Sequence, residues 1–343
     1  SLLAIINEIL DFSKIEAGKL VLENTPFNLR DLLQETLTIL APAAHEKQLE
    51  LLCLVYRDTP LSLIGDPLRL KQVLTNLVSN AIKFTREGSI VMRAMLEDES
   101  ADRAQLRISV QDTGIGLSED DLSELFQAFT QADNSISRQA GGSGLGLVIS
   151  KRLIEQMGGE IGVNSIPGEG SEFWISLSLP KARDDAEDLP RPPLLGQRAV
   201  MLENHELACQ ALQHQLEDCG LQVTACNNPN SLVQLVSDNQ HKANPIRLAI
   251  LGVSLKTLPP EHLAEHIQML QRLGCQVLVL CPTTEQSHYH GSLPDAHRQL
   301  QAKPACTRKL QRALADLISP RQTRHVPADN AQPSRPPHIL CVD

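Results

Sequence analysis

The chain has 343 residues, of which 42% are hydrophobic, 3% are aromatic and 21% are charged, and its formal net charge is −10. This length exceeds what one hydrophobic core usually supports, so we expect two domains with linkers. The acidic balance, without a Lys/Arg stripe interleaved with aromatic residues, argues against a nucleic-acid partner. The eight cysteines form no C-x-x-C pair and no Cys/His cluster at zinc spacing, which favours free thiols in a reducing cytoplasm.

The two ends of the sequence are typical of a segment of a longer protein. The sequence begins at Ser1 inside an apolar helical pattern and stops at "HILCVD", an apolar strand pattern that ends on an acid. It contains no signal peptide and no apolar run of about 18 residues that would span a bilayer. Apolar residues at nearly heptad spacing over 2–12 indicate a bundle or dimer helix, although a lone amphipathic helix fits the same pattern.

Apolar periodicity predicts mixed helices and strands over the first 180 residues. Asn28 and the Asp66–Pro67 pair are helix start signals, because Asn and Asp cap helices and proline fits the first helical position. The expected elements are a helix at 28–40, a strand at 49–57, a helix at 66–83, strands at 89–96 and 104–110, a helix at 145–153 and a hairpin at 160–179.

Composition changes at "KARDDAEDLPRPP", a charged and proline-rich stretch that we interpret as a linker. After it, short strands and helices alternate, which favours a doubly wound parallel sheet. The expected strands are 198–202, 221–226, 246–251 and 276–281, and the expected helices are 206–220, 231–238, 262–273 and 307–318. A second loose linker, "RQTRHVPADNAQPSRPP", precedes the final strand.

Four stretches carry residue types suited to a nucleotide. The first is "GGSGLGLVIS" at 141–150, where glycines lead into a helix. Such a loop presents backbone N–H groups and the positive end of the helix to an anion, usually a phosphate. Structural glycine turns are also common, so this stretch alone leaves both readings open.

The second stretch is a helix that carries Asn76, Asn80 and Lys83 beside its apolar stripe. Helix interiors disfavour Asn, so two of them one turn apart require an explanation. Amide oxygens suit Mg²⁺, and a lysine one turn further adds positive charge against phosphates. A solvated polar flank is the alternative.

The third stretch is "VQDTGIGL", where Asp112 ends a buried strand before Gly114 and Gly116. A carboxylate there can accept a hydrogen bond from an exocyclic amine, and the glycines let a base approach the backbone; a plain strand-to-loop turn is the alternative. The fourth stretch is "ELFQAFTQAD", with Phe126 and Phe129 one turn apart, followed by the polar "NSISRQAGG" where a nucleotide lid would need to move.

The order of these four stretches is far more specific than any one of them. Residues 25–180 resemble the ATP-binding catalytic domain of sensor histidine kinases, whose N, G1, F and G2 boxes follow the same order. Residues 1–20 resemble the second helix of the dimerisation domain that precedes it. The resemblance implies a GHKL-type α/β sandwich, with helices on one mixed sheet, and ATP and Mg²⁺ as cofactors.

The resemblance also implies a role for each matching position. Asn80 is the expected Mg²⁺ ligand, Asn76 is its neighbour beside the phosphates, and Lys83 is a phosphate contact. Phe84 is expected to pack on adenine, and Asp112 to bind the adenine amine.

Further positions belong to the expected ATP site. Gly114 and Gly116 follow the adenine-binding acid, and Arg138 matches a lid residue near the terminal phosphate. The remaining expected ATP-binding residues lie in or beside the lid: Phe129, Gly142, Gly144, Leu145 and Gly146.

Hydrolysing ATPases of the gyrase and chaperone type carry a glutamate where this chain has Asn76. An amide cannot act as the base that activates water, so transfer of the γ-phosphoryl group to a protein histidine is favoured over hydrolysis. Two alternatives stay open: a nucleotide-gated, non-catalytic scaffold, and a GHKL-type ATPase.

The acceptor histidine of this family, in a segment like His-Glu-x-Arg-Thr-Pro, is missing from the 11 histidines of the chain. His45 and His205 are each followed by Glu but not by the rest of the motif, and we interpret them as ordinary surface or cap residues. We therefore expect the chain to bind nucleotide without phosphorylating itself, and the fragment to supply no catalytic acceptor.

The part after Gly196 resembles a response-regulator receiver with a flavodoxin-like, doubly wound fold, but it departs from the receiver pattern. Glu203 and Asn204 stand at the acidic pair, Gly252 stands where the phosphoacceptor Asp is expected, and Cys281 stands near the expected hydroxyl. Only Lys303 fits its position. The region offers just two other acids as acceptors by misalignment, neither after the third strand: Asp238 and Asp295.

We expect six segments in the chain. They are the end of the dimerisation hairpin at 1–24, the catalytic domain at 25–181, a linker at 182–195, a degenerate receiver-like domain at 196–320, a linker at 321–337 and the first strand of a second receiver at 338–343. This order is that of hybrid sensor kinases. It implies a homodimer through the dimerisation helices, a phosphorelay with receiver and histidine-phosphotransfer domains and a response regulator, and the cytoplasmic portion of a bacterial inner-membrane protein.

Overall fold

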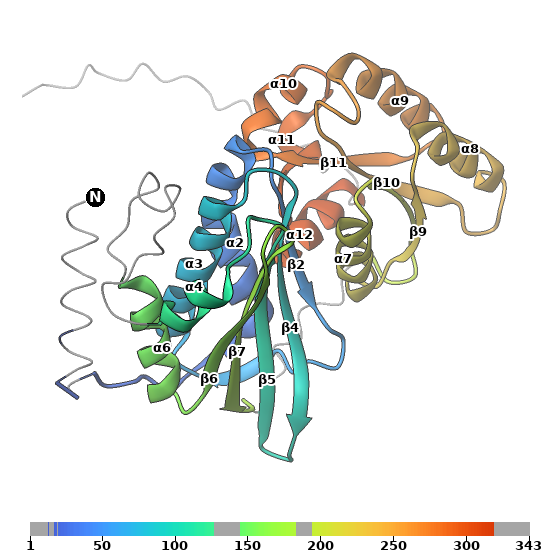
Figure 1. Cartoon of the computed structure of the whole chain (residues 1–343). Coiled ribbons are helices and arrows are strands. Elements are labelled where there is room, and N and C mark those ends of the chain that lie inside the picture. Colours follow the sequence, from blue (N-terminus) through green and yellow to red (C-terminus); the bar gives the residue numbers. More distant parts are fainter. Residues whose placement is uncertain (1–12, 14–16, 19, 127–144, 183–193, 319–343) are drawn as a thin grey trace, which may run out of the picture.

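Two five-stranded sheets form the centres of the two halves of the chain (Figure 1). The computed structural model describes residues 13, 17–18, 20–126, 145–182 and 194–318. We call residues 20–182 the N-terminal half and residues 194–318 the C-terminal half. Within the described residues, no helix is long and apolar enough to cross a membrane.

The N-terminal half contains both short and long strands and three long helices. Its elements are β1 (Thr25–Asn28), α2 (Leu29–Glu46), β2 (Glu50–Val55), β3 (Ser62–Gly65), α3 (Pro67–Phe84), β4 (Ser89–Glu99), β5 (Arg103–Asp112), α4 (Glu119–Glu124), α6 (Gly146–Gln156), β6 (Glu160–Ile166) and β7 (Gly170–Pro180).

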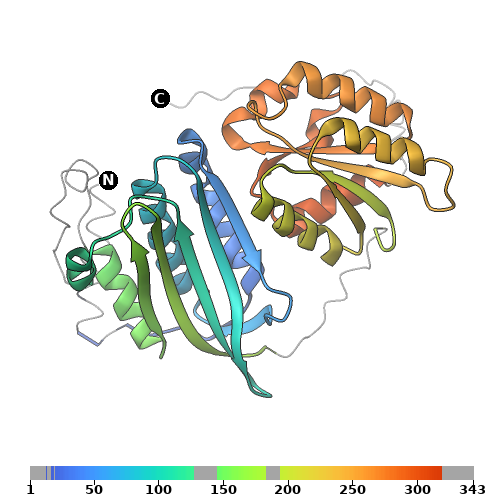
Figure 2. The same cartoon turned by 45° about the vertical axis from the view of Figure 1, so that its right-hand side comes forward.

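The main sheet of this half has the strand order β2-β4-β5-β7-β6. β2 pairs with β4 in parallel, and the other neighbours are antiparallel, so the sheet is mixed. Helices α2, α3 and α6 lie together on one face (Figures 1 and 2). Leucine, isoleucine and valine side chains from these helices and strands form one buried core, including Leu33, Leu74, Ile108, Ile149 and Ile175. This is the expected α/β sandwich.

Both expected helix starts are confirmed. The side chain of Asn28 accepts a hydrogen bond from the backbone N–H of Asp31, and Asp66 accepts one from Arg69, with Pro67 as the first helical residue. The sequence pattern does not reveal β1 and β3, which form a two-stranded sheet of their own. Their four residues each are too few for a clear alternation of apolar and polar positions.

The C-terminal half alternates strands and helices. Its elements are β8 (Arg198–Leu202), α7 (Glu206–Asp218), β9 (Gln222–Cys226), α8 (Pro229–Asn239), β10 (Ile246–Gly252), α9 (Pro260–Arg272), β11 (Gln276–Pro282), η1 (Thr283–Glu285), α10 (Gln286–His290), α11 (Ala296–Gln299), β12 (Leu300–Lys303) and α12 (Thr307–Ile318).

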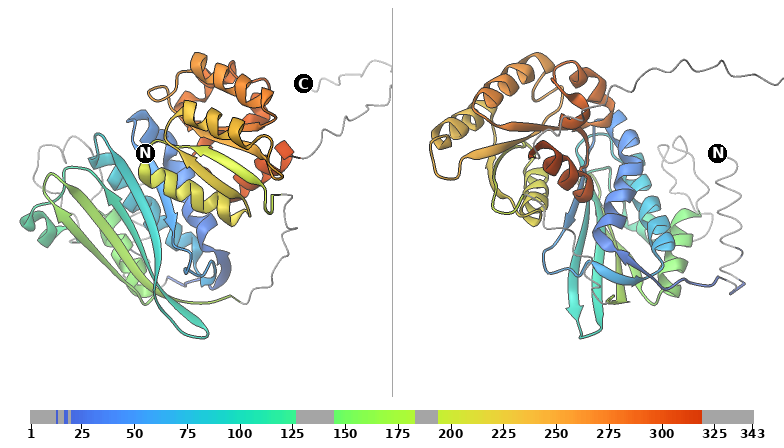
Figure 3. Two further views of the ribbon diagram at one scale, coloured as in Figure 1. Left: turned by 90° about the vertical axis from the view of Figure 1, so that its right-hand side faces the viewer. Right: turned by 180° about the vertical axis from the view of Figure 1, so that it is seen from behind.

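The second sheet has the strand order β12-β11-β10-β8-β9, and all its neighbours are parallel. This is the flavodoxin-like order, with helices on both faces (Figure 3). One buried cluster packs α7 and α12 on the sheet, and another packs α8 and α9 on the opposite face. The expected doubly wound sheet is confirmed, and β12 is the one strand of it that the sequence pattern does not reveal.

The two halves touch each other along α2, β2 and α7. Ala208 of α7 packs against Leu52 of β2 and Val91 of β4 in a small buried cluster of its own. Leu52 alternates along β2 with the core residues Leu51 and Cys53, so this contact lies on the face of the first sheet opposite its helices. The polar flank of α3 lies on the other face, among the helices of the N-terminal half.

Candidate functional site

Helix α3 presents a polar flank beside a fully buried apolar stripe. Leu70, Leu74 and Leu77 are essentially inaccessible, whereas Asn76 and Asn80 are half-buried. The stripe fixes the rotation of the helix against the sheet, since apolar residues at helical spacing must face the core. The two asparagines therefore keep a fixed direction beside the core.

Asn76 joins α3 to the beginning of α6. Its side-chain Nδ2 donates a hydrogen bond to the Oγ of Ser150 at 3.0 Å. Its carboxamide lies so close to Gly146 that a Cβ on that glycine would collide with it. The sequence thus brings an amide of one helix to the N-terminal end of another, and glycine at 146 is required for this approach. Ser150 is a residue that sequence reasoning does not find.

The beginning of α6 has no polar side-chain cap. Leu145 stands at the N-cap position, and a leucine side chain cannot accept a hydrogen bond from the first turn. The positive end of the helix dipole lies at the same place, so an anion is favoured there. Of the expected lid residues, four lie outside the described residues: Phe129, Arg138, Gly142 and Gly144.

Lys83 and Phe84 lie together at the C-terminal end of α3. The Lys83 Nζ lies 5.0 Å from the centre of the Phe84 ring, and burial lowers the pKa of Lys83. The end of α3 is held by Lys47, at the C-cap of α2. Its Nζ donates to the backbone oxygens of Ile82 at 2.6 Å, Lys83 at 3.0 Å and Thr85 at 3.4 Å. No sequence signal points to Lys47.

Asp112 is a buried carboxylate at the end of β5, with 6% of its surface exposed. Its Oδ1 accepts from the backbone N–H of Gly114 at 2.8 Å, and the Ser171 backbone also donates to it. Burial raises the pKa of Asp112 more than these two hydrogen bonds lower it. Within the described residues, no Lys or Arg forms an ion pair with it.

Gly114 and Gly116 let the loop after β5 pack closely on other backbone segments. A Cβ at Gly114 would meet the Phe84 carbonyl, and one at Gly116 would meet the Ile166 carbonyl. Gly116 also has φ +67°, which side chains rarely tolerate. The glycines therefore place Asp112 beside the end of α3.

The polar groups fit a magnesium–phosphate group better than a metal held by protein ligands alone. Among the described residues, no group of three or more His, Cys, Asp or Glu side chains is placed to hold a metal ion. The carboxamide of Asn80 makes no hydrogen bond to the described residues. One or two protein oxygens with substrate phosphates and waters is the usual Mg²⁺ environment, and Asn80 matches it.

The expected receiver positions also meet in space. Glu203, which follows β8 and is 7% exposed, accepts from the Lys303 Nζ at 2.7 Å. A Cβ on Gly252 would collide with the Glu203 carboxylate. Asn204 follows Glu203 after the same strand, and burial raises the pKa of the Cys281 thiol to about 12. The position where the resemblance predicts a phosphoacceptor is therefore occupied by the internal Glu203–Lys303 ion pair.

The two other acidic residues considered as acceptors in the C-terminal half, Asp238 and Asp295, do not lie at the acceptor position. Asp238 lies in α8, and Asp295 precedes α11, so neither follows the third strand of the sheet.

The two histidines followed by glutamate have different surroundings. His205 caps α7, where its Nδ1 accepts from the Ala208 N–H at 3.4 Å, and its expected cap role is confirmed. His45 is buried and its Nδ1 accepts from the Thr283 N–H at 3.0 Å. The expectation of a surface or cap residue at position 45 is wrong, because the C-terminal half covers α2 there.

Comparison with known proteins fits this geometry. Residues 65–181 match the family of histidine kinase-, DNA gyrase B- and HSP90-like ATPases. The chain is 71% identical over 343 residues to the sensor histidine kinase GacS of Pseudomonas protegens, and 38% identical over 333 residues to the signal transduction histidine-protein kinase BarA of Escherichia coli K12. These matches cover 100% and 95% of the chain but only 37% and 35% of the relatives.

A solved structure extends the likeness across both halves. Full-length ShkA in complex with AMPPNP matches 93% of the chain and 63% of its own length, with 27% identity and a TM-score of 0.67. The chain spans little more than a third of the curated relatives it matches. It belongs to the family of GacS- and BarA-like sensor histidine kinases, with an ATPase domain at residues 65–181.

Proposed function

We propose that the chain is the ATP-dependent kinase core of a hybrid sensor, which transfers the ATP γ-phosphoryl group to a histidine outside this sequence. One observation carries the proposal: α3 contacts both the start of α6 and the loop that follows Asp112. Its middle reaches the uncapped start of α6 through Asn76, and its end lies against the loop of Asp112 through the Phe84 carbonyl. A base at one end and phosphates at the other fit this arrangement.

Each end supplies the matching chemistry. Asp112 accepts a hydrogen bond from an exocyclic amine of the base, and Phe84 packs on the ring. Lys83 and the N–H groups at the start of α6 stabilise the phosphates, beginning at Leu145 and Gly146. When bound through Asn80, Mg²⁺ would neutralise phosphate charge. Oriented donors of this kind lower the barrier to phosphoryl transfer by electrostatic stabilisation.

Transfer is favoured over hydrolysis because, among the described residues, an amide rather than a carboxylate lies against the start of α6. Asn76 cannot take a proton from water, and its Nδ2 is held by Ser150. The family likeness of the first half to DNA gyrase B and HSP90 ATPases does not alter this point, since it concerns the shared nucleotide fold.

We also propose the division of the chain into a dimerisation segment at 1–24, a catalytic domain at 25–181, a degenerate receiver-like domain at 196–320 and the start of a second receiver at 338–343, with linkers between. Gly252 has no side chain that could carry a phosphoryl group, so the receiver-like domain is not the phosphate carrier. The whole protein would be an inner-membrane homodimer with its kinase in the cytoplasm. It would pass phosphate through receiver and histidine-phosphotransfer domains to a response regulator.

The test combines this chain with Mg²⁺, labelled ATP and a separate dimerisation-domain polypeptide that carries the missing histidine. We expect labelled acceptor, and loss of label with Asn80→Asp, because the altered ligand disturbs the metal position. Ser79→Ala, one position away on α3, is the matched control and keeps the label. Phosphate released without added acceptor would support a hydrolase instead, and ATP bound without transfer would support a scaffold.

A further inference from the structure

The C-terminal half contacts α2 of the catalytic domain through two hydrogen-bonded contacts. The side chain of Gln34 donates to the Thr307 Oγ1 at 2.9 Å and accepts from the Thr307 N–H at 2.8 Å, so it caps the start of α12. The His45 Nδ1 accepts from the Thr283 N–H. We call these two the α2 contacts.

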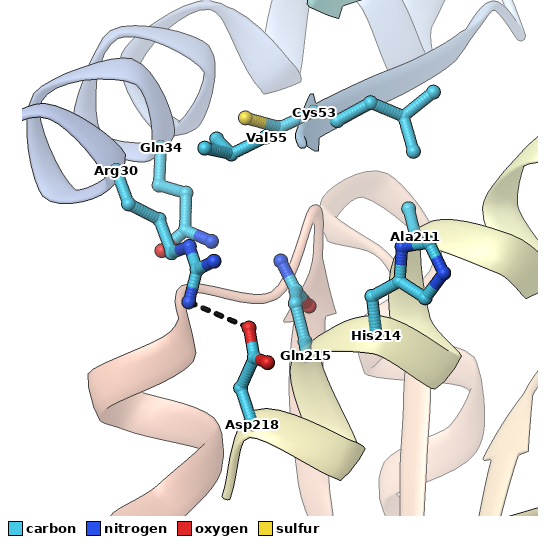
Figure 4. A pocket seen from close by; sticks show the side chains of 9 residues that line it. Arg30, Gln34, Cys53, Val55, Ala211, His214, Gln215 and Asp218 are labelled. Atoms are coloured by element: carbon cyan, nitrogen blue, oxygen red, sulfur yellow. Dashed lines mark ion pairs between the residues drawn. The ribbon is translucent and has the colours of Figure 1, made fainter. Parts of the chain in front are cut away.

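Charged pairs surround the α2 contacts. Arg30 of α2 pairs with Asp218 of α7 at 2.8 Å, and Asp31 pairs with Arg308 of α12 at 2.7 Å. Figure 4 shows Arg30 and Gln34 facing the end of α7, where Asp218 lies. Each pair keeps one partner substantially exposed, so we expect each to contribute modestly. Gln34 and His45 are buried, and their hydrogen bonds hold α2 in a defined position against the C-terminal half.

The residues of the C-terminal half that make the α2 contacts begin η1 and α12, next to the degenerate phosphoacceptor site. Thr283 directly follows β11, and Thr307 lies just after β12, which ends at Lys303. Lys303 is held by Glu203, so the ion pair that fills the acceptor position also fixes the end of β12. The end of the second sheet where a receiver would accept its phosphoryl group is therefore the end that faces α2.

The same helix holds the nucleotide-binding helix. His45 lies two residues before Lys47, whose Nζ binds three backbone oxygens at the C-terminal end of α3. Lysine bonds of this kind satisfy carbonyls that the helix itself leaves unpaired. Lys83 and Phe84 lie at that end, beside the Asp112 loop.

We propose that the degenerate receiver-like domain is a positioning element of the kinase: through Thr283 and Thr307 it holds α2, and through Lys47 the end of α2 holds Lys83 and Phe84 in the nucleotide-binding position. His45 and Lys47 are then positioning residues rather than catalytic ones. This inference rests on the proposed function, because it assumes that α3 forms one wall of the nucleotide site. Loss of the α2 contacts weakens nucleotide binding although no residue of the nucleotide site is changed.

A change on the receiver-like domain alone tests this inference. Thr283→Pro removes the N–H that donates a hydrogen bond to His45, and the proline ring occupies the space of that hydrogen bond. Proline fits there, because Thr283 is the first residue of η1 and the preceding Pro282 is extended, with φ −54° and ψ 143°. Thr283→Ala keeps the N–H and is the matched control.

The readout is the Kd of a non-hydrolysable ATP analogue with Mg²⁺, measured by calorimetry on the full chain. We expect Thr283→Pro to weaken binding about fivefold, as for a modest coupling between sites, and Thr283→Ala to bind like the unaltered chain within about twofold. A circular-dichroism melt confirms that each variant is folded.

The second pair of variants approaches the contact from α2. His45→Leu removes the acceptor and should weaken nucleotide binding as Thr283→Pro does, whereas His45→Asn places an amide oxygen near the position of Nδ1 and should restore it. Equal Kd values in Thr283→Pro, His45→Leu and the unaltered chain would overturn the inference and leave the proposed function standing. An unaltered chain that binds no nucleotide would overturn both.

Discussion

Asp112 in the catalytic domain and Glu203 in the receiver-like domain are both buried carboxylates just beyond a central strand, with 6% and 7% of their surface exposed. They differ in their partners. Asp112 is held by backbone N–H groups and has no cation beside it among the described residues, whereas Glu203 is paired with Lys303. Burial raises the pKa of Asp112, which means that the folded protein holds this charge at a cost.

The difference distinguishes a buried carboxylate that is available to a ligand from one that is already paired within the protein. We call the Glu203–Lys303 pair the closed site. A buried carboxylate without a cation keeps its acceptor capacity for a ligand and lowers stability in exchange, as functional groups often do. A carboxylate neutralised by an internal lysine has nothing left to bind, and removing the lysine would leave an uncompensated charge. Asp112 should therefore matter for nucleotide binding, and Glu203 for the stability of the fold.

The largest expected effect is on stability at the closed site. Lys303→Met should lower the free energy of unfolding by about 4 kcal/mol, because Glu203 then stays buried and charged without a partner. Urea unfolding measures this loss. The Kd for the ATP analogue should change far less than stability does.

Two further variants make that result specific. The double variant Lys303→Met with Glu203→Gln should recover much of the loss, since the charge is gone while an acceptor remains for the His205 N–H. Lys256→Met, on an exposed lysine, should change stability by less than about 0.5 kcal/mol. A single Lys303→Met variant as stable as the double would contradict the closed-site interpretation.

The second largest expected effect is the pH dependence of stability that arises from His45 at the contact between the two domains. Burial, with the positive charge of Lys303 nearby, lowers the pKa of His45 from 6.5 to about 4. The unfolded chain thus binds a proton between these pH values that the folded chain does not, so the contribution of His45 is complete above pH 6.5 and is lost as pH falls. Between pH 7 and pH 5 this amounts to about 2 kcal/mol of unfolding free energy.

Urea unfolding at the two pH values measures this effect. The variant His45→Asn has no titrating ring, so its stability should fall by about 2 kcal/mol less than that of the unaltered chain over the same interval. Equal losses in both proteins would show that the ring titrates normally and is not enclosed by the contact.

The smallest expected effect in free energy is at the proposed nucleotide site, and it appears in binding rather than folding. Asp112→Asn should weaken binding of the ATP analogue at least tenfold, or about 1.4 kcal/mol, because a hydrogen bond to a charged acceptor is lost. Stability should change by less than about 1 kcal/mol, since the substitution also removes a buried charge. Calorimetry and urea unfolding measure the two quantities.

Asp98→Asn, on the exposed end of β4, is the control for that substitution and should alter neither quantity. A large loss of stability in Asp112→Asn with unchanged nucleotide affinity would reverse the comparison. Asp112 would then be the structural carboxylate.

The sequence by itself determined most element positions and the residue types of the two sites. Helical and strand periodicity is a local property, so α3, β5 and the alternating strands of the second half were predictable, as were the caps at Asn28, Asp66 and His205. Short elements such as β1, β3 and β12 were not, because four residues carry too little pattern.

Only the tertiary structure decided which of these residues meet. Glu203 and Lys303 are 100 residues apart, and His45 and Thr283 are 238 apart, so no local pattern links them. The bond of Lys47 to the end of α3 depends on how two helices pack on one sheet. Hydrogen bonds and ion pairs between distant segments follow from the packing of the two sheets, and packing is a property of the whole chain rather than of any one segment.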